Sequence, residues 1–236
     1  MDSKPERTAR IQQFLCSVPL FAGVSEANLE IIAMESRIKL ATRGSFLFFR
    51  GDPADAVFMI MEGAVVIHID NLDGRELVIN EVGSGECFGE LGILTGQPHS
   101  ANAEAMVDSK VLVIPGTLFK VMLENEPSLV LRLLEITALR LQNSSRREEA
   151  LAFHDARQRL AHLLLHLDQL ASERGYLTFS QEDYAQRTGL TRQTVATILG
   201  DWRRRGWLLT GRGYLVLLNR RELNQLIQGM ETVPDR

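Results

Sequence analysis

The chain has 236 residues, of which 45% are hydrophobic and 24% are charged. This length and composition allow one large buried core or two modest ones. No apolar run approaches the roughly 18 residues needed to span a bilayer. Met1–Arg10 also lacks the apolar centre of a signal peptide. We therefore expect a cytoplasmic protein with no membrane partner.

The net charge of −4 is unevenly distributed along the chain. Residues 155–236 hold 12 Arg, no Lys and 9 acidic residues, a net charge of +3, whereas the remainder carries −7. A basic C-terminal third on an acidic body fits phosphate binding at one end. A chance imbalance of solvated charges would give the same pattern, so charge alone does not identify the partner.

Few residues indicate metal binding or catalysis. The two cysteines, Cys16 and Cys87, are too few for a disulfide framework or for the four thiolates of an iron–sulfur cluster. His162 and His166 are one helical turn apart, but no third ligand is evident and the three leucines between them predict a packed helix. No nucleophile is paired with a base. We expect neither a metal site nor an enzyme.

The pattern of apolar residues changes once within the first 115 residues, near residue 38. Residues 1–35 have Leu and Ile at helical spacing, which predicts short helices. From about 38 to 115, apolar runs are broken by glycine at short intervals, which is typical of an antiparallel sandwich or barrel. Asp73-Gly74 is a typical hairpin tip. The predicted strands include Phe46–Phe49, Val57–Met61, Val65–Ile69, Leu77–Ile79 and Val111–Ile114.

A long glycine-free stretch follows, from Gly116 to Gly175, and predicts mostly helix over Leu118–Ala171. A break at Ala152–Asp155 precedes a second amphipathic helix, Arg157–Leu170. The helix before this break carries a seam, a stripe of residues along one face, that suits pairing with a second copy of the chain. Packing of this helix on its own β domain would require a similar spacing of apolar residues. The seam residues recur every three or four positions: Val130, Leu133, Leu134, Thr137, Leu141, Ser144, Glu148 and Leu151.

Gln181–Gly200 has the spacing of a helix-turn-helix. Ala185 is small where the second helix crosses, and Gly189 lies in the turn, where a positive φ is needed. Val195 and Ile198 anchor the second helix to the first. Ser180 and Thr191 are the expected N-caps.

The second of these helices is expected to read DNA. Its N-terminal side chains reach base edges in the major groove. Two short strands, Leu208–Thr210 and Tyr214–Leu218, then form a wing whose tip offers Arg212 and backbone amides to phosphate. A last helix is expected over 220–230. The predicted DNA-binding residues are Gln181, Thr191, Arg192, Gln193, Thr194, Thr197 and Arg212.

A second group of motifs lies in the β region. Phe88-Gly89-Glu90-Leu91-Gly92, followed by Gly96-Gln97-Pro98-His99-Ser100-Ala101, resembles the phosphate-binding cassette of cyclic-nucleotide-binding domains. Arg50–Asp55 and Glu62-Gly63 match the same β-roll. With the long helix and the winged domain in the same order, residues 15–220 resemble the catabolite-activator/fumarate-nitrate-regulator (CRP/FNR) family of bacterial transcription factors.

The resemblance implies an α+β fold in three parts. Residues 1–125 would be an N-terminal antiparallel β-roll that binds the effector, together with the N-terminal helices. Residues 126–153 would be the long dimerisation helix and hinge. Residues 154–236 would be the C-terminal winged helix-turn-helix domain that binds DNA. The hinge is expected at Ala150–Asp155.

The resemblance also assigns an effector site. In cyclic-AMP-binding members the carboxylate after the glycine accepts the ribose 2′-hydroxyl, which here is Glu90. Ser100 matches the serine that donates to the cyclic phosphate, and Ser144-Ser145 match the hydroxyls that meet the adenine. Arg140 falls where a helix arginine approaches the pocket. With Gly89, Leu91 and His99, these are the predicted effector-binding residues.

His99 departs from the family pattern, because an arginine normally grips the cyclic phosphate at this position. A histidine of ordinary pKa is mostly neutral at pH 7. Losing the charged, bidentate contact should cost about 1.5–3 kcal/mol. The effector is therefore left open between a cyclic nucleotide such as cyclic AMP, a cyclic dinucleotide such as cyclic di-GMP, another metabolite and none.

The predicted function is a homodimeric, effector-controlled regulator that binds a palindromic double-stranded site, with RNA polymerase as a further partner. Arg192 would pair with guanine and Gln193 with adenine, which predicts half-sites about one helical turn apart that differ from the family's usual consensus. The alternative is a regulator that needs no effector, whose β-roll serves only dimerisation or polymerase contact. The effector, the promoters and the choice between activation and repression remain open.

Overall fold

The computed structural model describes residues 4–70, 76–171 and 175–228, without the side chains of 4, 146, 147 and 149–153. Residues 4–69 and 78–141 form one compact unit, whereas residues 70, 76 and 77 and the residues after 141 belong to a second one. None of the described helices is long and apolar enough to cross a bilayer.

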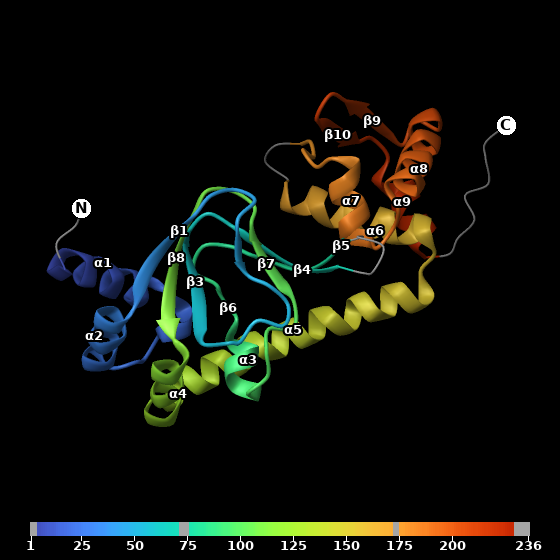
Figure 1. Ribbon diagram of the computed structural model, residues 1–236. Helices are drawn as coiled ribbons and strands as arrows, with labels where there is room; N and C mark the ends of the chain where they lie inside the picture. The colour runs from blue at the N-terminus through green and yellow to red at the C-terminus, as the bar shows by residue number, and fades with distance from the viewer. Residues whose placement is uncertain (1–3, 71–75, 172–174, 229–236) are drawn as a thin grey trace. The chain divides into compact units, whose positions relative to one another are not determined.

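The first unit is built around a β-roll that is preceded and followed by helices (Figure 1). The elements from residue 4 to residue 153 are α1 (Lys4–Ser17), a 3-10 turn (Pro19–Phe21), α2 (Glu26–Glu35), β1 (Arg37–Ala41), β2 (Phe46–Phe48), β3 (Ala56–Glu62), β4 (Val65–Asp70), β5 (Glu76–Val82), β6 (Cys87–Phe88), α3 (Glu90–Thr95), β7 (Asn102–Ala105), β8 (Ser109–Pro115), α4 (Gly116–Asn125) and α5 (Pro127–Phe153).

Two four-stranded sheets form the roll, in the orders β1-β8-β3-β6 and β2-β7-β4-β5. Side chains of a strand alternate between the two faces of a sheet. On β3, Phe58 and Ile60 therefore join the core between the sheets, whereas Val57 and Met59 join a second core shared with the helices. The predicted antiparallel sandwich is confirmed.

Three strands have no counterpart among the predicted runs. β1 mixes charged with apolar residues, β7 contains Asn102 and Glu104, and β6 has only two residues. Strands held by their neighbours need no apolar run of their own, so periodicity could not reveal them. The hairpin tip predicted at Asp73-Gly74 lies outside the described residues.

The predicted seam on α5 needs one correction. Leu133 is 5% exposed and lies with Leu129 in the core shared by the helices and the first sheet. Val130, Leu134 and Leu141 are exposed. The helix thus carries two apolar faces, one packed on its own unit and one uncovered, and the seam prediction merged them. The side chain of Leu151 lies outside the described ones.

The predicted helix break is also narrower than expected. α5 continues through Ala152 and Phe153, and only His154 and Asp155 separate it from α6 (Ala156–Leu170). The stop is set by Asp155, which forms a capping box with Gln158 and starts the next helix.

The remaining elements form a winged helix-turn-helix. They are α6, α7 (Gln181–Thr188), α8 (Arg192–Arg204), β9 (Leu208–Gly211), β10 (Tyr214–Leu217) and α9 (Arg220–Ile227). Trp202, Tyr184, Leu160 and Val195 lie in one fully buried core. α8 ends at Arg204, four residues past the end of the helix-turn-helix motif at Gly200, and its Trp202 belongs to this core.

Gly63 provides a test of the β-roll. It has φ +100°, and an added Cβ would overlap the Ser109 side chain and lie 2.8 Å from the Ser109 Cα. Gly85 has a similar positive φ, +82°, but open space around it. We expect Gly85→Ala to cost about 1–2 kcal/mol of unfolding free energy, from backbone strain alone. Gly63→Ala should cost clearly more, as measured by urea denaturation, and equal costs would contradict this packing.

Candidate effector and DNA-binding sites

The loop before α3 buries a carboxylate. Gly89 has φ 82°, and a Cβ there would lie 2.9 Å from the Phe58 ring, so both backbone and space require glycine. The next residue, Glu90, begins α3 and is only 1% exposed. A buried carboxylate is costly unless it is paired.

Arg140 of α5 is the partner of this carboxylate. Its Nη1 donates to Glu90 Oε1 at 2.5 Å, and its Nη2 donates to the carbonyl of Cys87. The structure thus brings together two of the predicted effector residues, 50 positions apart in the chain. The other carboxylate oxygen, Glu90 Oε2, is buried and accepts no hydrogen bond within the described part of the chain.

Burial raises the pKa of Cys87 to about 12, and the negative charge of Glu90 contributes to the rise. The thiol next to the ion pair is therefore protonated at neutral pH and is not a reactive thiolate.

His99 faces the interior of the roll. Its imidazole is 6% exposed and stacks on Phe48, with ring centroids 3.6 Å apart and an angle of 7° between the planes. Two backbone hydrogen bonds, His99 N to Asp52 O and Gly51 N to His99 O, hold the residue there. Burial lowers the pKa of His99 in spite of Asp52 and Asp55 nearby, so the ring is neutral at pH 7.

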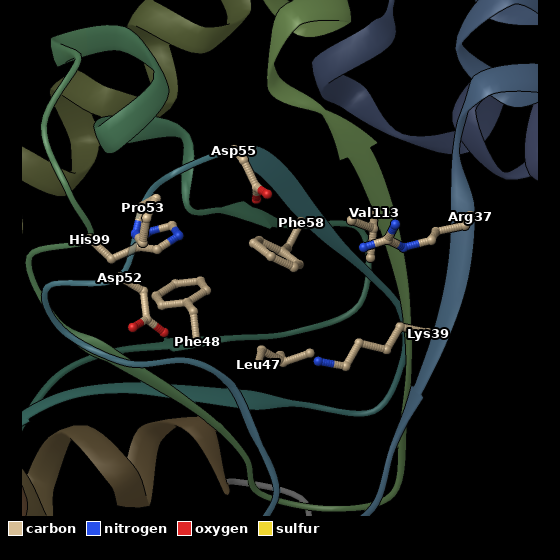
Figure 2. A pocket seen from close by; sticks show the side chains of 10 residues that line it. All are labelled: Arg37, Lys39, Leu47, Phe48, Asp52, Pro53, Asp55, Phe58, His99 and Val113. Carbon is tan, nitrogen blue, oxygen red and sulfur yellow. The ribbon is translucent and has the colours of Figure 1, made fainter.

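The His99 ring forms one wall of a cavity of about 290 Å³ (Figure 2). Arg37 and Lys39 of β1 face this cavity, because they pair with the inward-facing residues Val113 and Val111 of β8. Glu90 and Arg140 are not among the residues that line it. The lining residues are Arg37, Lys39, Leu47, Phe48, Asp52, Pro53, Asp55, Phe58, His99 and Val113.

Other predicted effector residues lie at the surface. Leu91 is 50% exposed, and Ser100 is exposed. Ser144 and Ser145 are exposed on α5, where Ser144 Oγ lies 3.5 Å from Glu148 Oε1. Sequence reasoning missed Phe48, Phe58 and Cys87, since apolar residues in a strand carry no distinguishing pattern.

The helix-turn-helix has the predicted caps and turn. Ser180 Oγ accepts from Asp183 N, and the Asp183 side chain accepts from Ser180 N, which completes a capping box. Gly189 takes φ 66°, as its place in the turn requires. Thr191 caps α8 by accepting from Thr194 N.

The caps and the core orient the first turns of α8. Arg192, Gln193 and Thr197 are exposed, whereas Val195 and Ile198 are buried. The hydroxyl of Thr197 donates to the carbonyl of Gln193. Gln181, Thr191 and Arg212 are exposed, and Thr194 is half-buried.

The far end of α8 carries a charge cluster that the sequence did not reveal. Asp201 is paired with Arg157 of α6 at 3.0 Å and lies near Arg204 and Arg205. Burial would raise the pKa of Asp201, but the arginines outweigh it and lower the pKa. Spacing shows the 201–205 pair, whereas the Arg157 contact depends on the packing of α6.

Family models match both halves of the chain. A cyclic nucleotide-binding domain matches residues 39–126, and a Crp-like helix-turn-helix domain matches residues 158–226. A CRP-like cAMP-activated global transcriptional regulator of Mycobacterium tuberculosis is 28% identical over 213 residues, which cover 87% of this chain and 95% of the relative. The cAMP-activated global transcriptional regulator CRP of Salmonella typhimurium is 30% identical over 181 residues, 74% of this chain and 86% of that protein.

Solved structures share the fold. FixK2 from Bradyrhizobium japonicum is 25% identical with a TM-score of 0.68, covering 81% of this chain and 96% of its own. The c-di-GMP responsive regulator CLP of Xanthomonas campestris is 23% identical with a TM-score of 0.74, covering 82% and 99%. The two matched domains follow each other in the same order as the two domains of the structure. The similarity covers most of the length of these relatives. The chain belongs to the CRP/FNR family of transcription regulators.

Proposed function

We propose that this regulator acts as a homodimer on a palindromic DNA site under the control of a cyclic nucleotide or cyclic dinucleotide. The observation that carries the DNA half is the exposed first turn of α8, held by the Thr191 cap and the buried Val195 and Ile198. RNA polymerase is the further partner that the family resemblance implies.

Base reading is assigned to two neighbouring side chains. Arg192 can form a bidentate pair with guanine, and Gln193 can do the same with adenine. Arg212 is exposed between the glycines at the tip of the wing, where it can contact phosphate. Thr197 is exposed, but its hydroxyl is already bonded to its own helix.

The dimer half rests on the uncovered stripe of α5. Val130, Leu134 and Leu141 are 42%, 63% and 67% exposed and follow each other at the spacing of a coiled-coil seam. Leucines so exposed are better buried against a second copy than left in water. Thr137 lies between them on the same stripe.

The effector half rests on the unmatched oxygen of Glu90. Buried polar atoms nearly always have a hydrogen-bond partner, and Oε2 has none among the described residues. A ligand hydroxyl, such as that of a ribose, would supply the donor. Arg140 already holds Oε1 in place for it.

The neutral, stacked His99 argues against a site that grips the cyclic phosphate as the arginine of cyclic-AMP-binding members does. Its ring would have to leave Phe48 before it could approach an anionic ligand near Glu90. A cyclic nucleotide should therefore bind more weakly than at a site with arginine, and a cyclic dinucleotide, which has more groups to bind, stays open. An effector-independent regulator remains the alternative function.

For DNA reading, we expect Arg192→Ala to weaken specific binding by about 1–3 kcal/mol, roughly five- to 150-fold, because one bidentate base contact is lost. Arg221→Ala, an exposed arginine of α9, is the matched control and should change affinity little. Fluorescence anisotropy on a selected site measures both.

The second base contact can be switched rather than removed. Gln193→Glu should move the preference at one position of each half-site from adenine to cytosine, because a carboxylate accepts from the cytosine amino group. In vitro selection on both proteins reads the change. If both proteins select the same consensus site, Gln193 does not contact a base.

For the dimer, we expect Leu134→Glu to weaken self-association by a hundredfold or more. Two copies of the leucine each lose about 1.5–3 kcal/mol of burial. Leu139→Glu, also on α5 and 60% exposed but off the stripe, should leave the dimer intact. Sedimentation equilibrium measures both, and a monomeric wild type would end the dimer proposal.

For the effector, cyclic AMP, cyclic GMP or cyclic di-GMP should raise the melting temperature. A ligand present at about 100 times its Kd adds about 2.7 kcal/mol. Glu90→Gln should abolish that shift, whereas Glu124→Gln on the exposed side of α4 should keep it. If none of the three ligands shifts the wild type, the effector-independent alternative is favoured.

A further inference from the structure

The cavity beside His99 has a charged rim over an apolar floor. Its volume of about 290 Å³ lies at the lower end of the range of about 300–1,000 Å³ that small-molecule pockets occupy, so it suits a ligand of amino-acid size. The charged lining residues Arg37, Lys39 and Asp55 are exposed, and Asp52 is half-buried. The floor residues are 4–9% exposed: Leu47, Phe48, Phe58, His99 and Val113.

The rim separates positive from negative charge. Arg37 and Lys39 lie on β1, whereas Asp52 and Asp55 lie in the loop before β3. β8 runs between β1 and β3, and its Val113 pairs with Arg37. Neighbouring strands are about 4.8 Å apart, so the backbones of β1 and β3 are about 10 Å apart. Figure 2 shows the two cations on one side of the cavity and the two carboxylates on the other.

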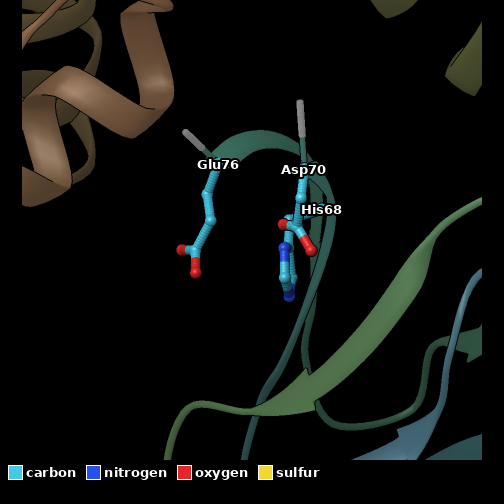
Figure 3. Close-up of side chains that lie close together, drawn as sticks. All are labelled: His68, Asp70 and Glu76. Carbon is cyan, nitrogen blue, oxygen red and sulfur yellow. The ribbon is translucent and has the colours of Figure 1, made fainter. Parts of the chain in front are cut away.

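The charges of the rim are available to a ligand. The side chains of Arg37, Lys39 and Asp55 have no ion-pair or hydrogen-bond partner among the residues that the structure describes. Other charged groups of the roll are engaged. His68 of β4, for example, which Figure 3 shows, lies 3.6 Å from Glu104 Oε2 through its Nε2. The cavity therefore combines an apolar floor with unpaired charges of both signs.

We propose that this cavity binds a small zwitterion with an aromatic body, the class of the aromatic amino acids and their short peptides. The ligand carboxylate would lie against Arg37 and Lys39, and its ammonium group against Asp55. An anion alone would leave Asp55 unmatched, and a cation alone would leave the two basic side chains unmatched. The ligand ring would pack on Phe48 and Phe58, where offset or edge-to-face aromatic contacts are favourable.

The same arrangement limits the cost of binding. A charged group loses much free energy when it is buried without a partner. The ligand charges would stay at the exposed rim, where water still reaches them, and only the ring would enter the apolar floor. Glu90 and Arg140 do not line this cavity, so the site is separate from the proposed effector site and its test does not depend on that proposal.

The test is calorimetric titration of the full-length protein with L-phenylalanine and with glycyl-L-phenylalanine. Two half-ligands accompany them: 3-phenylpropionate lacks the ammonium group, and 2-phenylethylamine lacks the carboxylate. We expect one site per chain for at least one zwitterion, and binding at least about tenfold weaker for each half-ligand, because one charge-assisted contact is lost. The tighter of the two zwitterions shows whether a free amino acid or a peptide is preferred.

Matched variants locate the ligand. Arg37→Gln/Lys39→Gln and Asp55→Asn should each weaken binding of the zwitterion about ten- to a hundredfold. Lys120→Gln and Glu124→Gln, two exposed residues of α4 outside the cavity, should bind like the wild type. All these side chains are exposed, so the melting temperatures without ligand should stay close to that of the wild type.

Three results would overturn the proposal. The first is that neither zwitterion binds the wild type. The second is that a half-ligand binds as tightly as the zwitterion from which it derives. The third is that binding is unchanged in the Arg37→Gln/Lys39→Gln and Asp55→Asn variants.

Discussion

The β-roll is organised around one buried charge. Glu90 lies at the start of α3 because Gly89 can take the left-handed conformation against the Phe58 ring. Removing one member of a buried ion pair typically costs 3–5 kcal/mol, since the other charge is left unpaired. Arg140 must therefore stay within reach, and α5 is tied to α3 and β6 by the same guanidinium group.

That constraint also shapes the proposed effector site of the first unit. Arg140 donates to one oxygen of Glu90, while the other is buried and has no hydrogen-bond partner among the described residues. A ligand that donates a hydrogen bond to this oxygen would satisfy it. His99 stacks on Phe48 as a neutral ring, so this side chain offers no charge to an anionic ligand.

The DNA-binding unit depends on packing of another kind. Trp202, Val195 and Ile198 fix the inner face of α8, and the outer face carries the residues proposed to read bases. Asp201 gathers Arg157, Arg204 and Arg205 at the far end of α8. One face of α8 packs in the core, and the opposite face carries the proposed recognition residues. These residues can therefore vary without changing the core.

The sequence by itself determined the helix-turn-helix, its caps at Ser180 and Thr191 and its turn at Gly189. It did so because each of these features arises from residues a few positions apart. It also determined the roll, and the family resemblance placed Glu90 and Arg140 in one site, although their ion pair came only from the structure.

Only the tertiary structure decided which leucines of α5 are covered and that His99 turns inward onto Phe48. These outcomes depend on strands and helices distant in the chain, and register sets which side chains meet across them. A helical or strand period assigns a residue to a face, but it does not say what that face will contact.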